Sequence, residues 1–262
     1  MDVLSPRTFD EALRLKAERP EAVLIQGGTD VMVELNFDRA RPPALLNLNE
    51  VEELRGWSRQ NGTVWLGAGL TYTEAMQPPL CDLLPALAEA ARTVGGPQIR
   101  NRGTIGGNLG TASPAGDAMP PLLVSEAEVR VVSVRGERSV PLEEFVTGPK
   151  RNDLAEDELI AGVSVTHGTP DSRQTFLKVG PRNAMVIAVV SLALRVDQEL
   201  LAAFGSAGPV PTLVRGRLSE VDSFPERVAA AASPIDDVRG TATYRRHALG
   251  VLTRRALDRC LA

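Results

Sequence analysis

Residues that commonly bind metals are scarce in this chain of 262 residues. Cys81 and Cys260 are its only cysteines, and His167 and His247 are its only histidines. An iron–sulfur cluster normally takes four such ligands and a catalytic zinc ion takes three, and the sequence has no CxxC or HxxxH pair. Each cysteine is expected to be a small buried hydrophobe, and each histidine is expected to be structural. No metal site is predicted, so any redox chemistry would need an organic cofactor.

An excess of positive charge and a long apolar run are also missing. The 29 Lys and Arg residues are outnumbered by 33 Asp and Glu residues, and the formal net charge is −4, which argues against a general nucleic-acid binder. The longest nearly apolar run, Ala184 to Leu194, is shorter than the roughly 20 residues that span a bilayer. The first residues lack the basic start and apolar core of a signal peptide. These absences predict a cytoplasmic protein with no nucleic-acid or membrane partner.

The residue pattern predicts an α+β protein made of three small units in sequence. In the first unit, Thr8 followed by Glu11 is a helix-start signal, so a helix is expected over 8–18. Short apolar runs predict strands at 22–25 and 44–48 that are buried on both faces. These elements together would form a small β-α-β-like unit.

The middle unit is expected to contain both helices and strands. A helix over 83–94 should end at Gly95-Gly96-Pro97, a strong terminating sequence. The segment that follows, 98–120, is rich in glycine and poor in core-forming residues. The other elements expected here are a helix-like stretch at 120–127, a hairpin that turns at Arg135-Gly136-Glu137, and a strand at 158–165.

The last unit follows a polar segment at 167–174 whose composition is typical of a linker. Its expected elements are three strands at 175–180, 184–196 and 200–207, and two helices at about 224–232 and 243–261. No internal repeat or low-complexity tract interrupts the chain.

One glycine-containing loop, Gln26-Gly27-Gly28-Thr29-Asp30, lies between an expected strand and an apparent helix start. Glycines let the backbone come close to a ligand and leave several N–H groups free to point outward. A diphosphate is a natural guest for such a loop. The alternative is a tight β-to-α turn without a ligand, and for this loop taken alone the turn is the stronger interpretation.

A second glycine-rich segment, Gly103 to Gly110, has four glycines in eight positions. Glycine loses much backbone entropy on folding. A loop without a ligand would therefore be more stable with fewer glycines. Thr104 and Asn108 add side-chain hydrogen-bonding groups, and Asp117 follows a little later. This composition favours close packing against a large polar ligand.

The standard nucleotide signatures are not met. A P-loop needs Gly-Lys followed by Ser or Thr, and the sequence has none. The stretch that begins at Gly67 starts like a dinucleotide fingerprint, but Tyr72 stands where the third glycine belongs. A Rossmann dehydrogenase is therefore disfavoured. The residues alone indicate a phosphate-bearing cofactor held by two glycine-rich segments.

Four segments spread along nearly the whole chain carry a family resemblance: LIQGGTDVM (24–32), QIRNRGTIGGNLGTASPAGD (98–117), KVGPRNAMVIAVVSLAL (178–194) and SPIDDVRGTATYRRHALGVL (233–252). Together they resemble the FAD-binding subunit of molybdenum hydroxylases, the family of the xanthine dehydrogenase and carbon monoxide dehydrogenase medium subunits. The TASPAGD sequence is closer to the xanthine dehydrogenase branch.

The resemblance implies which residues hold FAD. The first segment would wrap the adenosine diphosphate part, with the amides of Gly27 to Asp30 on the pyrophosphate. Thr104 and the backbone of Ile105 to Asn108 would meet the remaining phosphate and the ribityl chain. The full set implied is Leu24, Ile25, Gln26, Gly27, Gly28, Thr29, Asp30, Val31, Val94, Thr104, Ile105, Gly106, Gly107, Asn108, Asp117, Ile160 and Lys178.

Four of these residues have individual roles implied by the resemblance. Asp117 would accept a hydrogen bond from a cofactor hydroxyl, and Lys178 would approach the pyrimidine edge of the isoalloxazine. Val94 and Ile160 would pack on rings. Without the resemblance, Lys178 would be a solvated lysine and Asp117 the cap of the following helix.

The resemblance also implies the fold and the assembly. Residues 1–166 would form a two-subdomain FAD-binding fold of the vanillyl-alcohol-oxidase type, with subdomains at about 1–56 and 57–166. Residues 174–262 would form a C-terminal domain of three-stranded antiparallel sheet and helices. A molybdopterin-binding large subunit and a [2Fe-2S] small subunit would be partner chains in an α2β2γ2-type assembly, and NAD+ or another acceptor would take the electrons. No catalytic residue is expected in this chain.

Some features depart from the family, and some alternatives stay open. Some relatives carry an aromatic residue near the position of Val94, which this chain lacks. Two cysteines cannot supply the cluster-binding loop of the benzoyl-CoA reductase branch. The alternatives are a carbon monoxide dehydrogenase-like or other aromatic or purine hydroxylase subunit, a stand-alone flavin reductase of the same fold, and a scaffold that has lost its flavin.

Overall fold

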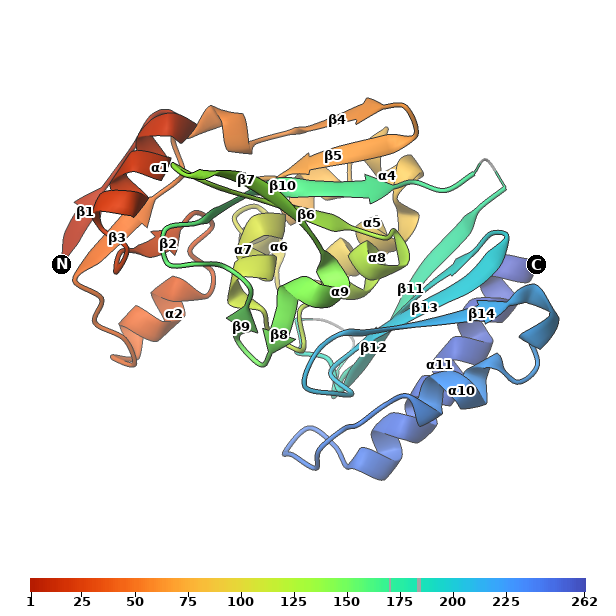
Figure 1. Cartoon of the computed structure of the whole chain (residues 1–262). Helices are drawn as coiled ribbons and strands as arrows, with labels where there is room; N and C mark the ends of the chain where they lie inside the picture. Colours follow the sequence, from red (N-terminus) through yellow and green to blue (C-terminus); the bar gives the residue numbers. More distant parts are fainter. Residues whose placement is uncertain (170, 183–184) are drawn as a thin grey trace.

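The N-terminal part of the chain forms a small parallel sheet (Figure 1). The computed structural model describes residues 1–169, 171–182 and 185–262. The strand order is β1-β3-β2, and both pairings are parallel. The elements of this part are β1 (Asp2–Leu4), α1 (Phe9–Glu18), β2 (Val23–Ile25), α2 (Val31–Asn36) and β3 (Ala44–Asn47).

Two of the expectations for this part are confirmed and one is wrong. The Thr8 side chain accepts a hydrogen bond from the Glu11 amide and starts α1, and β3 is a buried central strand. The strand β2 is not buried on both faces, because it lies at the edge of the sheet, and Val23 is exposed there.

The middle of the chain forms an antiparallel sheet of five strands in the order β4-β5-β10-β6-β7. Its central strand β10 is buried over nearly its whole length, and its register with β6 shifts between Ile160 and Gly162. The expected hairpin is confirmed as β6 and β7. The strands are β4 (Trp57–Gln60), β5 (Thr63–Gly67), β6 (Glu128–Ser133), β7 (Gly136–Pro141) and β10 (Leu159–Thr166).

Short helices connect these strands and pack beside the sheet (Figure 1). The helix expected over 83–94 is confirmed as α5, but it begins at Pro85, because the backbone breaks at Leu84 after the separate short helix α4. The helices are α3 (Tyr72–Ala75), α4 (Leu80–Leu83), α5 (Pro85–Thr93), α6 (Pro97–Arg100), α7 (Ile105–Thr111), α8 (Met119–Val124) and α9 (Leu142–Phe145), with a 3-10 turn η1 (Glu52–Leu54) and a small ladder of β8 (Val146–Gly148) and β9 (Arg151–Asn152).

The C-terminal part forms an antiparallel sheet of four strands rather than three, in the order β11-β12-β13-β14, with α10 and α11 packed beside it. The added strand β14 is an edge strand of mixed exposure that contains Gly216 and two arginines, so it lacks the apolar run that marks a core strand. The elements are β11 (Arg173–Val179), β12 (Val190–Val196), β13 (Glu199–Gly205), β14 (Thr212–Arg217), η2 (Leu218–Glu220), α10 (Phe224–Ala230) and α11 (Ala242–Leu261).

The second of these strands begins later than expected. Residue 184, the first of the expected strand, lies outside the described residues, as does residue 183. The strand itself starts at Val190. None of the described helices combines the length and the apolar character needed to cross a membrane.

The C-terminal sheet contacts the middle of the chain through α5 and α8. The Glu89 carboxylate on α5 accepts hydrogen bonds from the Phe176 amide at 2.6 Å and from the Thr175 hydroxyl at 2.9 Å. The buried Arg195 side chain on β12 donates to the Val124 carbonyl at the end of α8, at 3.0 Å. These contacts fix the position of β11 and of its Lys178 relative to α5 and α8.

Candidate cofactor site

The loop between β2 and α2 presents a run of unused backbone donors. Gly28 has a φ of +73°, a left-handed conformation that glycine adopts without a steric cost. The amides of Gly27 to Val31 donate no hydrogen bond to any other described residue. Successive free amides in a turn form a concave anion site, so this half-buried loop is suited to bind phosphate oxygens.

The two glycine-containing segments are in direct backbone contact. A Cβ atom on Gly27 would lie 2.1 Å from the Arg102 carbonyl oxygen and 3.1 Å from the Gly103 Cα atom. The Arg102 guanidinium also donates to the Gln26 carbonyl oxygen at 3.1 Å. Only glycine allows this approach, so the structure brings together two segments that are about 75 residues apart in the sequence.

The second segment is mainly a helix, and its first amides are already used. The Ile105 amide donates to Leu70 and the Gly106 amide to Ala68, at 2.9 and 2.8 Å. The amides of Gly107 and Asn108 donate to the hydroxyl and the carbonyl of the buried Thr104, which caps α7. Protein oxygens thus already occupy these four donors, so any contact of this backbone with a cofactor would not be a hydrogen bond from these amides.

Two buried side-chain oxygens lack partners beside this helix. Asn108 Oδ1 and Asp117 Oδ1 are shielded from solvent and have no hydrogen-bond partner among the described residues. A Cβ atom on Gly116 would lie 2.9 Å from Asn108 Nδ2, so Gly116 lets the segment before Asp117 pack against this carboxamide. Unpartnered buried acceptors cost free energy. Hydroxyl groups of a cofactor could donate hydrogen bonds to both oxygens. These two residues therefore fit the hydroxyl-bearing ribityl chain of the FAD that the resemblance implies.

Asp117 forms a buried ion pair with Lys178 of β11. The Lys178 Nζ atom lies 2.6 Å from Asp117 Oδ2, and the two side chains are 6% and 9% exposed. Burial raises the pKa of Asp117, and the Lys178 ammonium opposes that rise. Neither alternative interpretation holds: Lys178 is not solvated, and the Asp117 side chain does not cap α8.

The apolar residues Val94, Ile160 and Leu24 lie in the hydrophobic core or pack against it. Val94 is half-buried at the end of α5 and packs at the border of the core. Ile160 is buried in the core, near the place that a Cβ atom on Gly110 would occupy. Leu24 also packs against the core. The structure thus places Ile160 beneath α7 and leaves Val94 partly accessible.

Arg102 and Tyr72 also join the site, although the sequence interpretation did not expect either of them to bind a cofactor. Arg102 bridges Gln26 and the Asn49 side chain, and its place directly before Gly103 was the available signal. The buried phenol of Tyr72 packs beside Gly103, and burial together with the nearby Asp117 charge raises its pKa. Such a phenol stays protonated at neutral pH.

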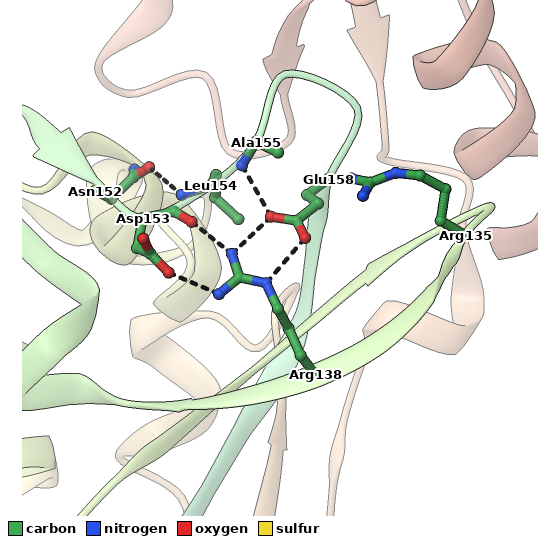
Figure 2. A pocket seen from close by; sticks show the side chains of 7 residues that line it. All are labelled: Arg135, Arg138, Asn152, Asp153, Leu154, Ala155 and Glu158. Carbon is green, nitrogen blue, oxygen red and sulfur yellow. Dashed lines mark hydrogen bonds and ion pairs between the residues drawn. The ribbon is translucent and has the colours of Figure 1, made fainter.

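A cavity of about 490 Å³ lies elsewhere and contains none of the expected site residues (Figure 2). Its lining is Arg135, Arg138, Asn152, Asp153, Leu154, Ala155 and Glu158. Figure 2 shows the Arg138 guanidinium between the carboxylates of Glu158 and Asp153, and Arg135 pairs with Asp157. Because these charges are compensated within the protein, we interpret this region as a structural ion network.

Comparison with known proteins decides the family. Residues 1–167 match the model of the FAD-binding domain in molybdopterin dehydrogenases. The chain belongs to that family. It is 30% identical to the xanthine dehydrogenase FAD-binding subunit of Escherichia coli O157:H7, over 97% of this chain and 94% of the relative. It is 33% identical to the nicotinate dehydrogenase FAD-subunit of Eubacterium barkeri, over 78% and 72%.

A solved structure extends the similarity to the fold. The carbon monoxide dehydrogenase of Hydrogenophaga pseudoflava that lacks the Mo-pyranopterin moiety contains a chain that superimposes with a TM-score of 0.91 at 25% identity. The superposition covers 98% of this chain and 96% of that chain. The chain is thus an FAD-binding subunit of an oxidoreductase of the molybdenum hydroxylase type, and its cofactor is FAD.

Proposed function

We propose that FAD binds along the line where the two glycine-containing segments meet. The five free amides from Gly27 to Val31 would donate to the pyrophosphate, with Leu24, Ile25 and Gln26 beside the adenosine. Backbone N–H groups are strong donors that need a partner once solvent is excluded. The backbone contact between Gly27 and Arg102 is the observation that carries this proposal.

Asn108 and Asp117 would accept hydrogen bonds from hydroxyl groups of the ribityl chain, because each has one buried oxygen without a partner among the described residues. Lys178 would be held near the ring system by Asp117, and Val94 would cover an edge of the rings. Thr104 would contribute by capping α7, because its hydroxyl accepts a hydrogen bond from the Gly107 amide. The amides that follow Thr104 would not donate to FAD. The ion pair and the buried Tyr72 would keep water away from this end of the site.

We further propose that this chain is the electron-transfer subunit of a xanthine dehydrogenase-like complex. Bound FAD would supply a carrier that takes electrons singly from iron–sulfur clusters and releases them as a pair, as hydride to NAD+. The relatives named above are FAD subunits of dehydrogenases, which supports a relay role. This chain's own residues would bind, orient and shield the cofactor, and none would act on the organic substrate.

The partners in this proposal are a molybdopterin-binding large subunit and a [2Fe-2S] small subunit. The xanthine dehydrogenase type is preferred because the TASPAGD sequence resembles that branch, and the xanthine dehydrogenase relative is 30% identical over 97% of the chain. The cytoplasmic location stays part of this proposal. A nicotinate-type complex is the second candidate, and assays of the assembled complex with purine and with nicotinate substrates would distinguish the two.

The site is tested by replacing Gly27. In Gly27→Ala the new Cβ atom would collide with the Arg102 carbonyl and separate the two segments, so we expect the FAD dissociation constant to rise at least about 100-fold, the loss of roughly 3 kcal/mol of binding free energy. The matched control is Gly250→Ala on α11, where the new atom would make ordinary contacts at 3.8 Å.

Binding would be measured by titrating the purified full-length chain with FAD and following the visible absorbance and the flavin fluorescence. The wild type and Gly250→Ala should bind with equal affinity. A wild-type chain that takes up no FAD, or a Gly27→Ala variant that binds as tightly as the control, would refute the proposed site. Co-purification with a molybdopterin chain and an iron–sulfur chain would test the relay role.

A further inference from the structure

The C-terminal segment Asp236–His247 has a well-defined structure but no role in the function proposed so far. The Asp236 carboxylate accepts from the Ala242 amide at 2.6 Å, and the Thr241 hydroxyl accepts from the Tyr244 amide at 3.2 Å. Both interactions start α11, as expected for short polar side chains at a helix N-terminus. They also fix the first turn of α11, which contains Arg245.

Arg245 is a buried cation with two acceptors. The residue is 3% exposed, and its guanidinium donates to the Asp237 carboxylate and to the Ser206 carbonyl oxygen. Asp237 is itself held by Arg239, through the backbone amide at 2.8 Å and the guanidinium at 2.7 Å. A planar guanidinium shared between two fixed acceptors leaves little freedom for either of them.

Ser206 has a backbone conformation that needs such support. Its φ is +62°, in the left-handed region that disfavours a residue with a Cβ atom. Its amide donates to the Pro114 carbonyl oxygen at 2.8 Å. The preceding Gly205 lies close enough that a Cβ atom there would be 3.1 Å from the same oxygen. The end of β13 is therefore fastened to Pro114.

Pro114 lies in the segment that connects the two unpartnered acceptors of the cofactor site. Two residues later Gly116 packs against the Asn108 carboxamide, and three residues later Asp117 pairs with Lys178. Inside the segment, the Gly116 amide donates to the Ser113 carbonyl at 2.9 Å. A shift of Pro114 would move Gly116 and Asp117 with it.

We infer that Arg245 is a positioning residue for the cofactor site, acting through Ser206 and Pro114 on the segment that carries Asp117. The inference rests on the proposed function in taking FAD as the occupant of that site. Arg245 touches none of the expected FAD ligands, so its effect would be on the geometry of Asn108 and Asp117. The C-terminal segment would in this way help to build a site whose phosphate loop lies at the other end of the chain.

The link is tested first without cofactor, by hydrogen exchange of the full-length flavin-free chain. In Arg245→Gln, the Ser206 amide and the amides at 115–116 should exchange at least tenfold faster, relative to the amides of β10, which report global unfolding. The matched control is Leu257→Ala, which removes a buried side chain far along the same helix. It should leave that ratio unchanged. An unchanged ratio in Arg245→Gln overturns the inference.

The consequence for the site is tested by FAD titration of the same variants. The dissociation constant should rise at least tenfold in Arg245→Gln, and less in Arg245→Lys, which keeps the charge but reaches only one of the two acceptors. Leu257→Ala should bind like the wild type. Faster exchange with unchanged FAD affinity would overturn the positioning role.

These outcomes separate the two proposals. A wild-type chain that takes up no FAD would refute the proposed function, while the exchange comparison would still decide whether Arg245 holds the segment at 113–117. Should Arg245→Gln not fold, Arg245→Lys takes its place in both measurements, and an unchanged exchange ratio in that variant overturns the inference.

Discussion

At the scale of single residues, the Asp117–Lys178 pair is the most consequential contact of the site. Two opposite charges, each less than 10% exposed, lie 2.6 Å apart. Removing water from both groups is costly, and their attraction compensates only while both are present. The pair joins the segment before α8 to β11, so it also ties the C-terminal sheet to the FAD-binding part of the chain.

Replacing one member of this pair should destabilise the flavin-free chain strongly. In Lys178→Met, Asp117 would stay buried without its cation, and we expect the free energy of unfolding to fall by about 3–5 kcal/mol. The double variant Asp117→Leu with Lys178→Met should recover most of that loss, because two apolar side chains need no compensation. Urea denaturation followed by circular dichroism measures both.

An exposed ion pair provides the control for this prediction. Lys150 pairs with Glu34 at 3.3 Å but is 63% exposed, so Lys150→Met should cost less than about 1 kcal/mol. If Lys178→Met were as mild as Lys150→Met, the buried pair would not have the energetic weight assigned to it.

At the scale of elements, α7 shows that glycines can serve helix packing rather than loop flexibility. A Cβ atom on Gly106 would lie 2.6 Å from the Ala68 Cβ atom and 2.8 Å from its carbonyl oxygen. The helix therefore packs tightly against the residue that follows β5. On Gly110, in the same helix, a Cβ atom would be no closer than 4.0 Å to Ile160.

Replacement by alanine should destabilise the chain at Gly106 but not at Gly110. Gly106→Ala should lower the free energy of unfolding by about 1–3 kcal/mol, because the overlap with Ala68 outweighs the gain in helix propensity. Gly110→Ala should leave it unchanged or raise it by up to about 1 kcal/mol. Thermal unfolding of the flavin-free variants makes the comparison, and equal effects at the two positions would contradict the packing described for α7.

At the scale of the whole molecule, acid stability should reflect carboxylates that are paired in separate parts of the fold. Hydrogen bonds from Arg138 and Arg135 lower the pKa values of Glu158 and Asp157. Burial acts to raise the pKa of Asp237, but hydrogen bonds from Arg239 and Arg245 prevail and lower it to about 2. Asp117 has the opposite shift, because burial raises its pKa.

The direction of these pKa shifts predicts the pH range in which the fold loses stability. A carboxylate with a lowered pKa in the folded state stabilises the fold above its unfolded value of about 4, and this contribution disappears as the pH falls toward the folded value. The melting temperature of the wild type should therefore drop more between pH 5 and about 3 than that of Asp237→Asn. Parallel curves for the two proteins would show that the Asp237–Arg245 pair does not contribute.

Local chemistry explains which elements the sequence could predict. The Thr8 cap, the turn at Gly136 and the apolar run of β10 depend on neighbouring residues, and all three are found in the structure. The helix α7 was missed because glycine disfavours isolated helices, while contacts with Ala68 and Leu70 stabilise this one. The edge strand β14 was missed because its pairing with β13 depends on a neighbour strand rather than on its own composition.

For the site, the residues by themselves indicated a phosphate-bearing cofactor held by two glycine-containing segments, and the family resemblance of four segments named that cofactor as FAD. Tertiary structure alone decided that Gly27 touches Arg102, that Asp117 and Lys178 pair, and that the amides after Thr104 are already used. The physical reason is that side-chain chemistry belongs to each residue, whereas burial and the choice of hydrogen-bond partner arise only when distant segments pack together.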